Sequence, residues 1–155
     1  ASQTLVDTPM KGDMRRGRAA AQNISPSSTG AAIATIEALP ELRGKFDGIA
    51  IRVPVISGSL VDVTFIASRS TTAEEVNRIL THAAKEERWM KTFSVTTEPI
   101  VSSDIVGSTY GCIADLSFTR VVDGTLVKVL GWYDNEMGYA HTLVEHVLAA
   151  GKHIK

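Results

Sequence analysis

A two-residue turn signal near the end of the chain restricts the fold more than any other local feature. Asp123-Gly124 separates two apolar segments, residues 112–122 and 126–130. Aspartate followed by glycine favours the tight turn that joins antiparallel strands, because this turn needs residues that tolerate positive φ angles. We therefore predict a β-hairpin here. A doubly wound nucleotide fold is built from parallel strands joined by helices, so the hairpin argues against that architecture.

Hydrophobic periodicity predicts the other elements of the chain. Further strands are expected at residues 45–53, 60–67 and 93–97. Helices are expected from about residue 30 to 39, from 72 to about 88, and from 138 to 150, with Gly151 just beyond the last of them. Strands outnumber helices. The predicted fold is therefore α+β, with a mixed, largely antiparallel sheet and helices on one face.

Two of these helices have recognisable signals. Thr72 and Glu75 have the spacing of a capping box, in which two side chains satisfy the free N–H groups of a helix start. An apolar stripe follows at Val76, Ile79, Leu80 and Ala83. The helix at 138–150 carries a similar stripe, which we expect to be buried: Leu143, Val144, Val147 and Leu148.

Residues 1–23 have neither a helical nor a strand period. They contain turn residues and three arginines, Arg15, Arg16 and Arg18. A loop this long inside a compact domain is usually functional or disordered. One short basic cluster in a chain of net charge −1 favours a solvated or intersubunit loop over a nucleic-acid site.

Length and composition exclude several classes of protein. Residues 1–155 suit a single domain. The sequence has no run of about 18 apolar residues and no basic-then-apolar leader, so we expect no membrane span and no secretory signal. A lone cysteine, Cys112, cannot form an internal disulfide, which suits a reducing cytoplasm. The nearly neutral charge favours no nucleic-acid partner.

Two polar positions could bind an anion. Ser28-Thr29-Gly30 opens a predicted helix, whose free N–H groups and positive dipole end suit a phosphate. The alternative is an ordinary helix cap. Arg52 ends a predicted strand on the face of Phe46, Gly48 and Ala50, from which it could project into a pocket. The alternative is a surface or ion-paired arginine.

Three segments carry a resemblance to a known family: Ser25-Pro-Ser-Ser-Thr-Gly-Ala-Ala32, Gly48-Ile-Ala-Ile-Arg-Val-Pro54 and Trp132-Tyr-Asp-Asn-Glu-Met-Gly-Tyr139. In this order and approximate spacing, they resemble the second domain of phosphorylating glyceraldehyde-3-phosphate dehydrogenase. The resemblance implies a glycolytic, NAD-dependent parent enzyme that forms a tetramer. It also implies that residues 1–23 are the S-shaped loop between subunits, and that helix 138–150 docks against the nucleotide-binding domain.

The resemblance also assigns roles to individual residues. Thr29 and Gly30 match residues that bind inorganic phosphate or the relocating substrate phosphate, and Arg52 matches the arginine that holds the C3 phosphate of the triose. Arg16 matches an arginine near the same pocket. The segment after Arg52 departs from the usual Thr-Pro-Asn, reading Val55-Ile-Ser57.

Three further residues match the cofactor side of the family's site. Asn135 corresponds to the asparagine that orients nicotinamide, and Tyr139 lies beside it. Pro9 matches a loop proline that borders the neighbouring subunit's cofactor and accompanies NAD rather than NADP. From local sequence alone, Asn135 would be explained by turn formation, Tyr139 by core packing and Pro9 by turn stiffening. Met137 replaces the family's usual aromatic residue.

The chemical residues of the family are missing from this sequence. Its nucleophile lies in a Ser-Cys-Thr-Thr-Asn stretch, which does not occur here, and its base histidine lies in a stretch that would precede Ala1. The sequence surroundings of Cys112 and of the four histidines match neither the nucleophile nor the base of the family. Their spacing does not suggest a metal site. We therefore expect these residues alone to be inactive. Erythrose-4-phosphate dehydrogenase and a noncatalytic phosphate-binding or oligomerisation module stay open as alternatives.

Overall fold

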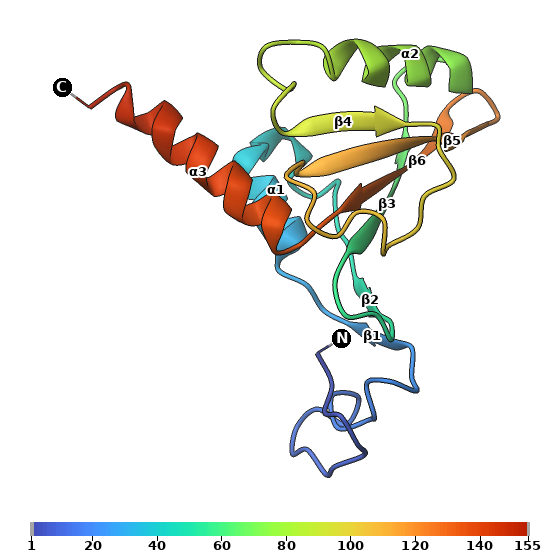
Figure 1. Ribbon diagram of the computed structural model, residues 1–155. Coiled ribbons are helices and arrows are strands. Elements are labelled where there is room, and N and C mark those ends of the chain that lie inside the picture. The colour runs from blue at the N-terminus through green and yellow to red at the C-terminus, as the bar shows by residue number, and fades with distance from the viewer. Residues whose placement is uncertain (1, 155) are drawn as a thin grey trace. The chain divides into compact units, whose positions relative to one another are not determined.

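The computed structural model describes residues 2–154 (Figure 1). The chain divides into two compact units, residues 1–56 and 57–155, and each is described by itself. The assignment of residues 1–155 to a single domain stays a prediction.

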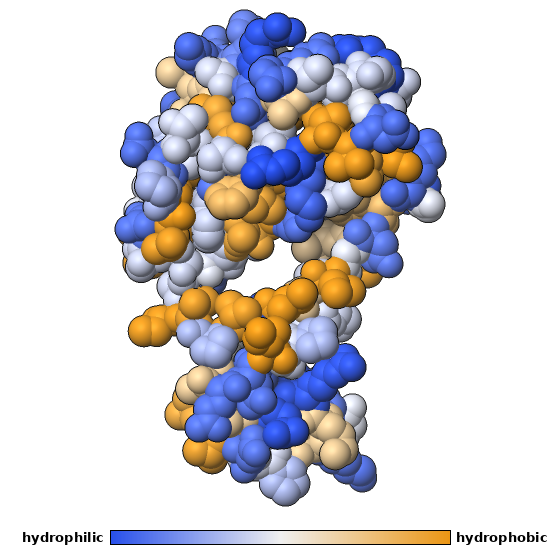
Figure 2. Space-filling model, turned by 90° about the vertical axis from the view of Figure 1, so that its right-hand side faces the viewer, coloured by the Kyte–Doolittle hydropathy of each residue, from blue (hydrophilic) through white to orange (hydrophobic). Residues whose placement is uncertain are grey.

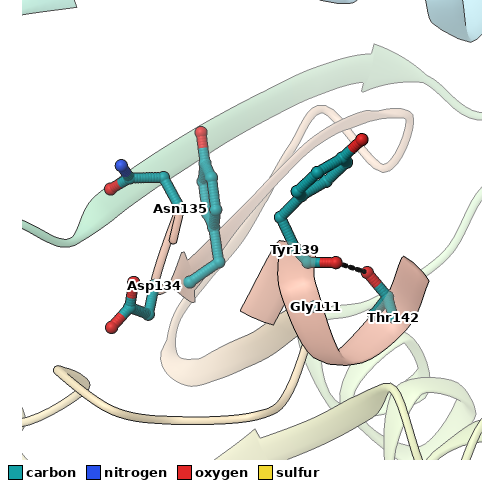
Figure 3. Close-up of a pocket in the computed structure, with 6 residues that line it drawn as sticks. Gly111, Asp134, Asn135, Tyr139 and Thr142 are labelled. Carbon is teal, nitrogen blue, oxygen red and sulfur yellow. Dashed lines mark hydrogen bonds between the residues drawn. The ribbon is translucent and has the colours of Figure 1, made fainter. Parts of the chain in front are cut away.

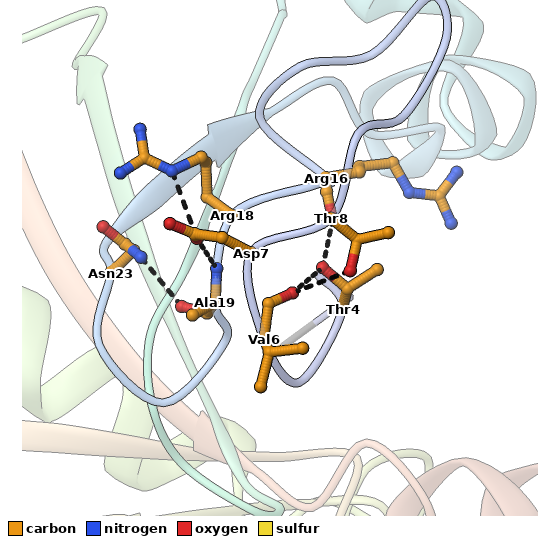
Figure 4. Close-up of polar contacts among 8 residues, drawn as sticks. All are labelled: Thr4, Val6, Asp7, Thr8, Arg16, Arg18, Ala19 and Asn23. Carbon is orange, nitrogen blue, oxygen red and sulfur yellow. Dashed lines mark hydrogen bonds and ion pairs between the residues drawn. The ribbon is translucent and has the colours of Figure 1, made fainter.

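The first unit begins with a loop that folds on itself. Residues 2–24 contain no helix or strand, as the sequence predicts. The N–H groups of Thr4 and Thr8 donate to the carbonyls of Arg16 and Gly17, at 3.0 and 2.8 Å. The Asp7 carboxylate accepts a hydrogen bond from the Ala19 N–H at 2.8 Å, and these contacts cross the loop (Figure 4). The segment therefore has a defined local structure without regular elements.

A short ladder and a helix complete this unit. Strand β1 (Ser25–Ser27) pairs antiparallel with β2 (Ala50–Arg52), so that Ser25 lies opposite Arg52. The predicted strand at 45–53 is therefore wrong in length, because its partner offers only three residues. Helix α1 (Ala31–Ala38) ends before Pro40, as predicted, and a 3-10 turn η1 (Pro40–Leu42) follows it.

The second unit is built on a four-stranded sheet. Its elements are β3 (Ser59–Ile66), α2 (Ala73–Ala83), β4 (Phe93–Thr96), β5 (Cys112–Val122), β6 (Leu126–Tyr133) and α3 (Met137–Gly151). The strand order is β3-β6-β5-β4, with β4 parallel to β5 and the other pairs antiparallel. Asp123 and Gly124 have φ angles of 49° and 67°, as the predicted hairpin turn requires. The α+β fold with a mixed, largely antiparallel sheet is confirmed.

Both helices of this unit end differently from the prediction. Helix α2 stops at Ala83 instead of near residue 88. The N–H groups of Lys85 and Glu86 bond to carbonyls three residues back, which tightens the chain out of the α-helix. Gly151 is the last residue of α3, and Lys152 closes the helix with φ −67°. The prediction that Gly151 lies just beyond the end of this helix is therefore wrong.

The core of the second unit is small. Val127, on the central strand β6, is fully buried, and Ala114 and Ile105 are nearly so. Helix α2 packs over β5 and β4 (Figure 1). The predicted burial of the α3 stripe is wrong in this structure, because its four apolar side chains are 47–60% exposed.

Apolar side chains also lie open on the sheet. Alternation puts Val61 and Phe65 on one face of β3 and Leu60 and Ile66 on the other, and all four are exposed. Figure 2 shows apolar side chains gathered into patches on the face that it presents. The second unit therefore exposes apolar surface on α3 and on both faces of its edge strand.

We expect the chain to self-associate in solution. Contiguous apolar patches of this kind exceed what a monomeric soluble protein normally exposes. Val147→Glu on α3, where the native side chain is 60% exposed, should weaken association because a charge opposes burial of the stripe. Light scattering coupled to size-exclusion chromatography measures the mass.

His146→Glu, an exposed polar position on the same helix, is the matched control and should leave association unchanged. A monomer at high micromolar concentration would contradict the expectation.

A largely exposed ion pair joins the segment before α2 to the first turn of the helix. The Arg69 guanidinium binds Glu75 with both arms, at 2.6 and 3.1 Å, and the Thr71 hydroxyl donates to Glu75 at 2.7 Å. Thr72 accepts the Glu75 N–H, which confirms half of the capping box, while the Glu75 carboxylate turns to Arg69 instead. These contacts lower the pKa of Glu75 to about 2.

This pKa shift predicts a pH dependence of stability. The folded pKa of Glu75 lies below its ordinary value of 4.5, so the contribution to stability is present above pH 4.5 and is lost as the pH falls toward 2. Glu75→Gln should lower the melting temperature by a few degrees near pH 7. The difference from the native chain should vanish near pH 2. Glu41→Gln, at an exposed glutamate, is the control. A difference that does not vary with pH would refute the assignment.

Candidate functional site

The start of α1 presents the first candidate group. The Thr29 hydroxyl oxygen accepts the Ala31 N–H at 3.1 Å, one residue before the N-cap Gly30, and this leaves the hydroxyl proton free to donate. Gly30 has φ −79°, and a Cβ there would meet nothing within 4 Å. Neither backbone conformation nor packing inside the described chain requires glycine at this position, and the missing side chain leaves the backbone open to close approach.

Arg52 belongs to the same unit. Its side chain is half-buried, and its Nε donates to the Ser27 hydroxyl at 3.4 Å. Ser27 lies two residues before Thr29, so the β1–β2 ladder brings the guanidinium to the strand that leads into α1. Among residues 2–154, no carboxylate pairs with Arg52. A half-buried, unpaired guanidinium beside a helix start is suited to bind a phosphate.

The loop residues Arg16 and Pro9 occupy different surroundings. The Arg16 side chain is exposed and points away from Arg18 (Figure 4). Its backbone N–H donates to Asp13 at 3.1 Å. Pro9 lines a pocket of about 630 Å³ together with Met10, Met14 and other residues of the loop. The structure shows no contact between Arg16 and Arg52.

The turn between β6 and α3 carries the second candidate group. The Asn135 Oδ1 accepts two hydrogen bonds, from the Gly58 N–H and the Ser59 hydroxyl, both at 3.2 Å. Its Nδ2 donates to Glu136 at 3.2 Å. Because a carbonyl oxygen has two lone pairs and an amide nitrogen two hydrogens, only one N–H of Asn135 stays available. Asn135 can therefore offer a ligand a donor but no acceptor.

A buried carboxylate precedes Asn135. Asp134 is 3% exposed. One of its oxygens accepts the Gly107 N–H at 2.8 Å, and the other accepts those of Glu136 and Met137 at 2.8 and 3.0 Å. These three backbone hydrogen bonds lower the pKa of Asp134.

Asn135 and Tyr139 line one shallow pocket. It measures about 270 Å³ and is also lined by Gly111, Tyr133, Asp134 and Thr142. Tyr139 is 66% exposed, and Figure 3 shows its ring projecting from the first turn of α3. Gly138 lets this turn approach the chain, because a Cβ there would lie 2.6 Å from the Tyr110 carbonyl oxygen. The pocket combines an aromatic face with a free amide donor.

The remaining reactive residues are placed outside both groups. Burial raises the pKa of the Cys112 thiol, so this cysteine is a poor nucleophile, as its sequence context suggests. Within the described range 2–154, no group of three or more histidine, cysteine or acidic side chains could hold a metal ion. In the same range, no helix has the length and apolarity to cross a membrane.

Three residues of the two candidate groups were not identified from the sequence. Ser27 contacts Arg52 only because β1 pairs with β2, and Pro26 within β1 hid that strand, since proline lacks a ladder donor. Gly58 reaches Asn135 from a distant part of the chain. Asp134 could have been suspected from its spacing, because aspartate commonly caps N–H groups two and three residues ahead.

Comparison with known proteins places the chain among its relatives. The family model for the C-terminal domain of glyceraldehyde 3-phosphate dehydrogenase matches residues 1–135. Glyceraldehyde-3-phosphate dehydrogenase 2 of Streptomyces avermitilis is 49% identical over 98% of this chain and 45% of its own length. The enzymes of Streptomyces coelicolor and Clostridium acetobutylicum are 47% and 46% identical over 98% and 92% of this chain. The chain thus spans about half the length of the curated relatives it matches.

Proposed function

Because the chain belongs to the family of the glyceraldehyde 3-phosphate dehydrogenase C-terminal domain, we propose that it is the phosphate- and nicotinamide-binding half of a phosphorylating, NAD-dependent enzyme of glycolysis. The observation that carries this proposal is the unpaired, half-buried Arg52 guanidinium beside the strand that leads to Thr29 and Gly30. The relatives are named for the triose, which favours glyceraldehyde 3-phosphate over a tetrose phosphate.

The proposed roles follow from the groups each residue leaves free. Arg52 binds the substrate phosphate through its guanidinium, with two N–H arms suited to two phosphate oxygens. Thr29 donates its hydroxyl proton, and Gly30 admits a second phosphate to the start of α1. We further propose that Arg16, which does not contact Arg52 in this chain, adds positive charge near the bound phosphates, as the family resemblance implies. These residues bind and orient substrate, whereas the nucleophile and the base come from outside residues 1–155.

The residues at the Asn135 pocket fit a nicotinamide. When bound, NAD supplies the hydride acceptor of the reaction. The one free N–H of Asn135 suits the carboxamide oxygen, and the exposed Tyr139 ring offers an apolar surface beside it. Pro9 borders the cofactor of a neighbouring subunit. We further propose a cytoplasmic homotetramer in which α3 docks against the nucleotide-binding domain, because its apolar stripe is bare in this chain.

Replacing Arg52 by lysine tests the phosphate role. In a full-length enzyme whose C-terminal half is this chain, Arg52→Lys keeps the charge but loses the two-armed contact, which costs about 1–3 kcal/mol. We expect kcat/KM for glyceraldehyde 3-phosphate to fall roughly 5- to 150-fold, chiefly through KM. The rate with glyceraldehyde, which has no phosphate, should not change.

Arg43→Lys is the matched control, since Arg43 is an exposed arginine of the same unit. Equal losses with both aldehydes would show that Arg52 acts on the structure and not on the phosphate.

A further inference from the structure

The Asp134 carboxylate is the buried acidic group closest in sequence to the candidate cofactor residue. It is 3% exposed and faces no cation among the described residues. All three of its hydrogen bonds come from backbone N–H groups. A carboxylate held in this way is costly to bury without its donors, so its position is firmly determined.

Two of those donors directly follow Asn135 in the chain, and the third comes from a distant loop. The N–H groups of Glu136 and Met137 lead into α3, where a negative charge is favourable. The Gly107 N–H belongs to the loop between β4 and β5. Asp134 therefore fixes the backbone of the turn and ties it to a second segment.

The Asn135 amide depends on that backbone. Its Oδ1 meets Gly58 and Ser59 at 3.2 Å, which is near the long end of useful hydrogen bonds. A small rotation of the turn would break these contacts and release the amide to turn over. The free N–H would then no longer have a fixed direction.

We propose that Asp134 is a positioning residue, which holds the Asn135 amide so that its single free N–H points at the ligand carbonyl. The proposal rests on the proposed nicotinamide role of Asn135. It assigns to Asp134 no contact with the cofactor or substrate.

Asp134→Asn separates the two functions of the carboxylate. Asparagine retains one oxygen, which can continue to accept the Glu136 and Met137 N–H groups at the helix start. Its NH2 group then faces the Gly107 N–H, so that two donors oppose each other and the tether to that loop is lost. The helix cap is preserved while the position of the turn is released.

Asp115→Asn is a matched control. Asp115 is 2% exposed and also accepts three hydrogen bonds, from the Ser117 N–H, the Ser117 hydroxyl and the Trp132 indole. It has no contact with Asn135. Both substitutions should lower the melting temperature, but only Asp134→Asn should disturb the Asn135 amide.

Two measurements test the proposal. In the 155-residue chain, the side-chain NH2 signals of Asn135 in a nitrogen–proton correlation spectrum should shift and exchange faster with water in Asp134→Asn, and stay unchanged in Asp115→Asn. In the full-length enzyme, Asp134→Asn should weaken NAD binding roughly 5- to 50-fold, with KM for NAD changing more than kcat. Unchanged Asn135 signals in Asp134→Asn would overturn the proposal, as would equal disturbance by both variants.

Asn135→Ala separates this proposal from the proposed function. If Asn135→Ala leaves NAD affinity intact, the nicotinamide role is wrong, and the spectrum alone then decides whether Asp134 positions the amide. If Asn135→Ala weakens NAD binding and Asp134→Asn does not, the positioning role is wrong and the nicotinamide role stands.

Discussion

Residues 1–155 by themselves are expected to form no NADH from glyceraldehyde 3-phosphate, phosphate and NAD. Covalent catalysis needs a thiolate to attack the aldehyde, and binding residues cannot replace it because they act on a step that no longer occurs. Cys112 is the one thiol of the sequence, and its pKa is raised by burial. The rate should be indistinguishable from buffer when NADH absorbance is followed.

The Streptomyces avermitilis enzyme, assayed in parallel, provides the positive control. Any rate above buffer that disappears in Cys112→Ser would identify Cys112 as a nucleophile and refute its structural role. A rate that survives Cys112→Ser would mean that a group other than this thiol catalyses the reaction, and it would contradict the expectation that residues 1–155 alone are inactive.

Val127→Asp is expected to abolish folding of the second unit. Val127 is fully buried near the start of β6, opposite Phe65 on one side and Val121 on the other. An uncompensated buried charge costs on the order of 3–5 kcal/mol. That is a large share of a total stability of about 5–15 kcal/mol. Circular dichroism should show loss of the cooperative thermal transition.

Val122→Asp makes the same change at the exposed end of β5 and should leave the transition nearly intact. Val127→Ala, which removes volume without adding charge, should lower the melting temperature while keeping the transition. A cooperative transition in Val127→Asp at the native temperature would mean that the sheet core lies elsewhere.

Local chemistry predicted the second unit well. Strand β5 spans the residues expected for it, and the Asp123-Gly124 turn has the two positive φ angles that its sequence requires. Strand β6 runs three residues further than expected, to Tyr133, because its pairing with β3 extends to Ser59. The hydrophobic pattern predicted where β6 begins, but its pairing with β3 determines where it ends.

The candidate site depended more on long-range pairing. The hydrogen bond of Thr29 was predictable, since it involves a neighbour two residues away. The contact between Arg52 and Ser27 needed the β1–β2 register, and the contact between Asn135 and Gly58 needed the position of the segment before β3. Exposure of the α3 stripe was also hidden, because periodicity shows that a helix has an apolar face without showing what covers it.

The Asp123-Gly124 turn has a consequence for the order in which the second unit folds. It lets β5 and β6 meet by closing a short loop between the paired residues Val122 and Leu126, which carries a small entropic cost. The pairing of β3 with β6 joins residues far apart in the chain, such as Ser59 and Tyr133, and closes a much longer loop. Contacts between sequence neighbours form fastest. We therefore expect the β5–β6 hairpin to be the folding nucleus. Strand β3 then pairs with β6 after the hairpin has formed.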